Sequence, residues 1–131
     1  MNLKSLRIIT ADIKRLVPFY ESVTGLPAQW FTEDFAELAA GTATLAIGST
    51  RTLGLFGEGV AEPASNKSVI IEFLVENVDE AYERLKVLAP VIEQQPTTMP
   101  WGNRSLLFRD PDGNLINFFT PVTPEAIQKF S

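Results

Sequence analysis

The chain has 131 residues and a formal net charge of -5, with 45% hydrophobic and 21% charged residues, as expected for one globular domain. It contains no cysteine and no histidine, which excludes disulfides, thiolate metal sites, a cysteine nucleophile and the commonest general base. No apolar run approaches the roughly 20 residues that span a bilayer and no signal-peptide pattern is present, so a cytoplasmic protein is expected.

The first half predicts a strand, a helix and three further strands. Residues 3 to 10 alternate like a strand, and Asp12 is expected to cap a helix over residues 13 to 25. Pro18 is expected to kink this helix or to delay its regular part until about Val17. The three strands that follow are predicted at residues 28–32, 35–41 and 43–49.

The second half repeats this order after a polar connector at residues 57 to 68. Asn77 is expected to cap a helix over residues 78 to 88, with Glu80 completing a capping box. Strands are predicted at residues 69–75, 91–95, 104–110 and 114–120. A turn at Asp112 and Gly113 joins the last two of them.

The order β-α-β-β-β therefore occurs twice, which indicates a duplication inside a single α+β domain. The first module spans about residues 1 to 56 and the second about residues 69 to 121. A short C-terminal helix over residues 123 to 130 follows, with Thr123 as its N-cap and Pro124 at its first position.

Two motifs carry a resemblance to a known family. ADIKRLVPFYESVTGL follows the first strand, and FRDPDGNLINF forms the last hairpin. At this separation, and flanking a repeat, they resemble the vicinal oxygen chelate superfamily, which includes glyoxalase I, extradiol dioxygenases, fosfomycin-resistance enzymes and bleomycin resistance proteins. The resemblance covers essentially the whole chain. It implies an open, cup-shaped mixed sheet whose floor holds a divalent metal in the metal-dependent members.

The resemblance also implies which positions would hold that metal. They fall on Ser5, Ala46, Ile70 and Asn117. None of these side chains is an imidazole or a carboxylate, so we expect no metal, no other cofactor and no metal catalysis. Glu37 and Glu72 are the nearby carboxylates that a one-residue shift of this alignment would recruit.

Within the superfamily the chain looks most like the bleomycin resistance proteins, which sequester a drug without chemistry. GLPAQWFTEDFAEL and PWGNRSLLFRDPDGN resemble segments whose aromatic side chains line a drug groove at a dimer interface. The resemblance gives a groove role to Trp30, Phe31, Phe35 and Trp101. Core packing is the alternative for each tryptophan, and the PWG element also occurs in members with other functions.

Strand alternation adds polar groups to this lining. If Ser5 faces the cup, Arg7 faces it too, and Glu72 is its counterpart in the second module. These two side chains either pair with each other or bind polar groups of a ligand. Three further residues are expected on that face: Thr44, Asn117 and Phe119.

The remaining aromatic residues are expected away from the ligand. Phe56, Phe108 and Phe118 are predicted in the core, and Tyr20 and Tyr82 in the core or an interface. The acidic residues 32 to 34 either attract a cationic drug or are simply solvated. The pI near 4.7 argues against nucleic-acid binding and suits a neutral or cationic partner, although acidity also serves solubility alone.

The sequence thus favours a homodimer that binds a hydrophobic or aromatic small molecule without a metal, as in drug or antibiotic sequestration. Two alternatives stay open. One is an enzyme of the superfamily, a lyase, isomerase or dioxygenase with an atypical site, in which Glu72 acts as base if no metal takes part. The other is a domain that serves oligomer assembly alone and has a collapsed cup.

Overall fold

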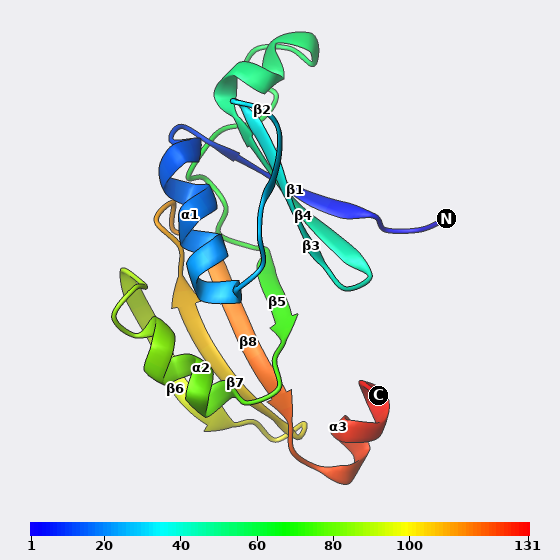
Figure 1. The fold of residues 1–131 in the computed structure, drawn as a ribbon. Coiled ribbons are helices and arrows are strands. Elements are labelled where there is room, and N and C mark those ends of the chain that lie inside the picture. Colours follow the sequence, from blue (N-terminus) through cyan, green and yellow to red (C-terminus); the bar gives the residue numbers. More distant parts are fainter. The chain divides into compact units, whose positions relative to one another are not determined.

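A computed structural model describes residues 1–131, which form two compact units, Met1–Asn66 (unit 1) and Lys67–Ser131 (unit 2). Unit 1 consists of β1 (Ser5–Thr10), α1 (Ile13–Thr24), β2 (Gln29–Thr32), β3 (Phe35–Ala40), β4 (Ala43–Ser49) and the 3-10 helix η1 (Thr50–Leu55) (Figure 1). Unit 2 consists of β5 (Ile70–Leu74), α2 (Val78–Leu85), β6 (Val91–Thr98), β7 (Asn103–Arg109), β8 (Leu115–Pro121) and α3 (Pro124–Lys129). The predicted order β-α-β-β-β is present in both units.

Each unit is built on a mixed four-stranded sheet whose first strand pairs in parallel with its last. The strand orders are β1-β4-β3-β2 and β5-β8-β7-β6. Parallel neighbours cannot be joined by a tight turn, and α1 and α2 lie in the connections that bring the chain back. The two sheets therefore have the same topology.

The cores lie between each sheet and its helix. Leu16, Val17 and Tyr20 of α1 are fully buried, and α1 packs on β3 and β4. In unit 2 the predicted core residues Phe108 and Phe118 are buried and meet edge to face, with ring centroids 5.0 Å apart. We call the face of each sheet opposite its α1 or α2 helix the open face.

Pro18 does not delay the first helix, so of its two expected effects the late start is wrong. The helix begins at Ile13 and continues to Thr24, where Gly25 closes it in the left-handed conformation. A proline removes the N–H that would bond to the carbonyl four residues earlier, here that of Lys14. Pro18 and Lys14 are both exposed, so water can solvate the freed carbonyl.

Phe56 is not a core residue, contrary to expectation. It follows η1, a six-residue 3-10 helix that the sequence did not predict, and it is 65% exposed. The Ser49 hydroxyl accepts from the Arg51 N–H at 3.2 Å and starts η1. This turn carries the chain away from the core and leaves Phe56 beside the open face.

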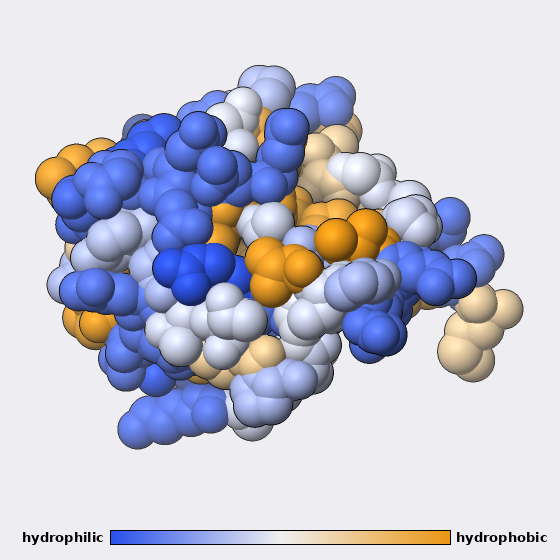
Figure 2. Space-filling view, turned by 90° about the horizontal axis from the view of Figure 1, so that it is seen from below, coloured by the Kyte–Doolittle hydropathy of each residue, from blue (hydrophilic) through white to orange (hydrophobic).

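Hydrophobic side chains are exposed at several places along the chain, among them Leu55, Val60 and Val87. Figure 2 shows one such group of hydrophobic side chains near the middle of a largely hydrophilic face. None of the three α-helices is long and apolar enough to cross a membrane.

The turn before β7 is held against the start of α3 by Gly102. The Gly102 carbonyl accepts hydrogen bonds from the N–H groups of Val122 and Thr123, at 2.8 and 3.2 Å. Its φ is +96°, and a Cβ placed there would clash with the Thr123 hydroxyl and lie 3.1 Å from the Ala126 Cβ. The PWG sequence thus serves a structural role through its glycine.

We therefore expect Gly102→Ala to lower the free energy of unfolding by about 2 kcal/mol or more, because it combines backbone strain with a steric clash. Gly113→Ala is the matched control, since Gly113 has a φ of +84° but nothing within 4 Å of its Cβ position. It should cost only about 1 kcal/mol. Urea denaturation measures both, and equal losses would show that the contact with Thr123 is unimportant.

Candidate functional site

The parallel strand pairs place two charged residues at equivalent positions in the two units. Arg7 on β1 pairs with Ala46 on β4, and Glu72 on β5 pairs with Asn117 on β8. Paired residues in adjacent strands point to the same face of the sheet. Each open face therefore has one charged residue on its edge strand, next to a neutral residue on β4 or β8.

In unit 2 the charged residue is held by its neighbour. The Asn117 Nδ2 donates to the Glu72 Oε2 at 2.8 Å. Asn117 is only 9% exposed, and its Oδ1 is buried without a hydrogen-bond partner. Because an unpaired buried acceptor costs free energy, this oxygen is a favourable position for a donor from water or a ligand.

In unit 1 the charged residue is held by aromatic rings instead. The Arg7 guanidinium lies 4.9 Å from the ring centroid of Phe35 and 5.9 Å from that of Phe56. Within unit 1 the Arg7 side chain makes no hydrogen bond and no ion pair. Its donors are therefore available to another group.

The predicted aromatic residues of unit 1 separate onto two faces. The rings of Phe31 and Phe35 are 5.9 Å apart, and Phe31 is 55% exposed. Trp30 pairs with Ala36, which is buried on the α1 face, so Trp30 points to that face although it is 42% exposed. The structure therefore brings Phe31 and Phe35 together with Arg7 and does not bring Trp30 to them.

The aromatic residues of unit 2 also occupy different places. Trp101 lies in the turn before β7, and its side chain is 67% exposed. Phe119 is buried beside Phe130, which follows α3, with ring centroids 5.0 Å apart. The end of the chain thus covers the part of the open face around Phe119.

The residues at the four family metal positions do not fit a divalent ion. Ser5 and Ala46 in unit 1, and Ile70 and Asn117 in unit 2, provide a hydroxyl and an amide but no carboxylate or imidazole. No group of three or more acidic residues is arranged to hold a metal. We therefore derive no chemistry through a metal ion.

The acidic residues 32 to 34 are partly engaged in the fold. Asp34 accepts from the Ser49 hydroxyl at 2.7 Å and pairs with Arg51 at 2.6 Å. The hydrogen bond from Arg51 holds the pKa of the Asp34 carboxyl below its usual value. This carboxylate fixes the β2–β3 turn to the end of β4 and is not free to attract a cation.

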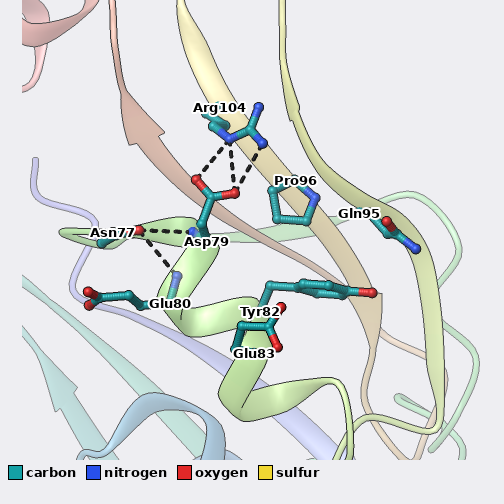
Figure 3. Close-up of a pocket in the computed structure, with 8 residues that line it drawn as sticks. All are labelled: Asn77, Asp79, Glu80, Tyr82, Glu83, Gln95, Pro96 and Arg104. Carbon is teal, nitrogen blue, oxygen red and sulfur yellow. Dashed lines mark hydrogen bonds and ion pairs between the residues drawn. The ribbon is translucent and has the colours of Figure 1, made fainter.

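A separate hollow of about 480 Å³ lies on the α2 side of unit 2 (Figure 3). Its lining includes Asp79, Glu80 and Tyr82 of α2 and Arg104 of β7. Arg104 donates to both carboxylate oxygens of Asp79, so these two charges are satisfied within the fold. No residue predicted for the site lines this hollow.

Comparisons with known proteins establish the class. The profile of the Glyoxalase/Bleomycin resistance protein/Dioxygenase superfamily matches residues 2–118. The uncharacterized protein YraH of Bacillus subtilis (strain 168) is 30% identical over 125 residues, which cover 91% of this chain and 98% of YraH. The chain therefore belongs to the glyoxalase/bleomycin resistance protein/dioxygenase superfamily, and the predicted resemblance is confirmed.

Solved structures agree with this assignment. The integron cassette protein VCH_CASS1, from the mobile metagenome of V. cholerae, is 30% identical with a TM-score of 0.70, over 92% of this chain and 94% of that one. A superfamily member from Burkholderia phytofirmans PsJN has a TM-score of 0.82 at 17% identity, over 93% of this chain and 100% of that one. At its low identity, the Burkholderia structure shows a shared fold and nothing about function. The predicted α+β fold is confirmed.

The pairing of Glu72 with Asn117 makes a pH-dependent prediction. Asn117→Asp would place a second carboxylate against Glu72, and their repulsion raises the pKa of the pair in the folded protein. A raised folded pKa means that stability falls as the pH rises above the unfolded value of about 4. Relative to wild type, we expect the variant to lose about 1 to 3 kcal/mol more at pH 7 than at pH 4.

Urea denaturation at the two pH values measures this difference. Adding Glu72→Gln to the variant removes the repulsion between the two carboxylates. It should therefore restore most of the stability that the variant loses at pH 7 but not at pH 4. The same destabilisation at both pH values would show that residue 117 does not meet Glu72 as described.

The absence of metal-binding side chains at the family positions is also testable. We expect elemental analysis of the purified protein to find zinc, nickel, manganese and iron well below one ion per chain, because a hydroxyl and an amide bind such ions too weakly. One ion per chain, retained through gel filtration, would contradict this reading of the four positions.

Proposed function

We propose that the protein binds a hydrophobic, aromatic small molecule without a metal, as a homodimer, and sequesters it as bleomycin resistance proteins do with their drug. The observation that carries this proposal is the group of accessible rings on the open face of unit 1. Phe31, Phe35 and Phe56 gather there around Arg7, and Phe31 and Phe56 are more than half exposed.

Exposed rings on a sheet face favour an aromatic ligand for two physical reasons. Covering them removes apolar surface from water, which is worth about 25 cal/mol per Å². Ring pairs add about 0.5 to 1.5 kcal/mol beyond this burial when they stack offset or edge to face. A flat ligand can obtain both contributions without any chemical step.

Polar residues would then set the orientation of the ligand. Arg7 offers donors on the open face of unit 1. The Glu72–Asn117 pair separately offers acceptors on the open face of unit 2. We also assign a contact to Trp101, but leave out Phe119, which Phe130 covers, and Trp30, which points to the α1 face. A mostly apolar lining with few polar groups is typical of small-molecule sites.

The proposed dimer is supported by the exposed apolar side chains near the C-terminus. Trp101, Val122 and Ile127 are all at least 44% exposed. The Gly102 carbonyl bonds to the Val122 N–H, so Trp101 and Val122 are held close to each other. Aromatic and aliphatic residues of this kind are enriched at the centres of interfaces.

A superfamily enzyme is a second candidate, favoured by one observation. Asn117 fixes the orientation of the Glu72 carboxylate, which remains exposed and is a possible base. The two candidates differ in the fate of the ligand. Mass spectrometry of a ligand recovered after prolonged incubation should find it unchanged if the protein only binds.

The binding proposal is tested by the two tryptophans. A thermal-shift screen of aromatic antibiotics and metabolites should yield a stabilising compound that also quenches tryptophan fluorescence. Trp101→Ala should then weaken the Kd about tenfold or more and leave the Tm nearly unchanged, because the ring is 67% exposed. Trp30→Ala is the matched control and should leave the Kd unchanged. Unaltered affinity in Trp101→Ala would remove this residue from the site.

A further inference from the structure

The Arg7 side chain is positioned on the open face of unit 1 without using its hydrogen-bonding groups. A guanidinium has five N–H donors in a fixed plane and no acceptor. Within its unit, Arg7 contacts the rings of Phe35 and Phe56, and neither ring takes up an in-plane donor as a carboxylate would. The charge is thus held in place while the donors stay free.

The strand beneath Arg7 leaves room for this arrangement. The neighbouring positions of β4 on the open face are Ala46, which pairs with Arg7, and Gly48, which pairs with Phe35. A Cβ at Gly48 would lie 2.8 Å from the Thr52 Oγ1 and 3.6 Å from the Phe35 ring. Small residues at both positions therefore let the ring and the guanidinium lie close to the sheet.

A carboxylate of the same unit lies nearby but does not neutralise Arg7. Glu37 on β3 shares the row of Arg7 and Ala46, two strands away. Although the register brings them onto one face, the two side chains form no ion pair, and the guanidinium turns to Phe35. Intramolecular pairing within unit 1 therefore leaves the charge available.

We propose that Arg7 binds the carboxylate of an aromatic acid, which names the class of ligand for the proposed function and rests on it. The two carboxylate oxygens accept parallel hydrogen bonds from the guanidinium edge. The ring of the ligand lies against Phe31 and Phe35, whose own rings are 5.9 Å apart. The negative carboxylate of an aromatic acid complements the positive guanidinium, and its apolar ring complements the phenylalanine rings of this face.

The acidity of the whole chain does not oppose this assignment. The net charge of -5 is spread over the surface, and at physiological ionic strength charges are screened beyond about 8 Å. A guanidinium in direct contact acts within that distance. The local charge therefore decides whether an anion binds here.

The test uses two probes of the same shape, 2-naphthoate and 2-naphthamide. Isothermal titration calorimetry at low salt should show that wild-type protein binds the carboxylate about tenfold or more tightly than the neutral amide. Added salt should weaken only the binding of naphthoate. This comparison requires no variant, so it does not depend on the folding of a mutant.

Variants assign the preference to Arg7. Arg7→Gln should lose the tenfold preference for naphthoate and keep the affinity for naphthamide. Arg7→Lys should retain only part of that preference, because an ammonium group does not form the bidentate pair. Lys4→Gln removes the same charge just before β1 and should behave like wild type. An unchanged preference in Arg7→Gln would overturn the inference.

The probes also separate the inference from the proposed function. Equal affinity of wild-type protein for naphthoate and naphthamide would overturn the role of Arg7 and leave binding of aromatic molecules standing. If neither compound binds at millimolar concentration and no aromatic compound stabilises the protein, the proposed function falls and the inference falls with it.

Discussion

The parallel pairing of the first and last strands in each unit is the constraint on which the candidate site depends. Parallel neighbours require a crossover, and in both units the connection includes a helix that covers one face of the sheet. Because the residues of adjacent strands are in register, the same pairing fixes which side chains share a row. Arg7 with Ala46, and Glu72 with Asn117, follow from this one geometric rule.

The two units use this shared geometry for different chemistry. In unit 2 an amide bonds to the charged residue and retains a buried acceptor, so the row offers oxygen atoms. In unit 1 an alanine stands where the amide would be, and rings from β3 and the end of η1 hold the charge. With neutral residues at the family metal positions, each unit holds its charged residue by its own contacts.

The features that follow from hydrophobic periodicity, such as which residues of a strand share a face, were predicted from the sequence. Features that depend on local backbone geometry were not. Alternation and the repeat placed Arg7 and Glu72 at equivalent positions of β1 and β5, each within its own unit, because a period of two can be read without knowledge of packing. The face of Trp30 was not predictable, because the register shifts between Trp30 and Thr32. Phe56 was wrongly assigned to the core because η1, the element that exposes it, has no hydrophobic periodicity and could not be recognised in the sequence. The late helix start expected from Pro18 was wrong, because the cost of a proline inside a helix depends on whether water can solvate the carbonyl that loses its hydrogen bond.

The way in which an arginine is held decides what it can recognise. An arginine paired with a carboxylate has its charge neutralised and its donors occupied, so a ligand must displace that partner and desolvate both groups. An arginine lying on aromatic rings loses side-chain freedom before the ligand arrives but keeps its donors, because rings interact with its face and a carboxylate with its edge. Asp34 with Arg51 and Asp79 with Arg104 are pairs of the first kind and stabilise turns and helix ends. Within unit 1, Arg7 is of the second kind, and for this reason its open face is suited to binding an anion.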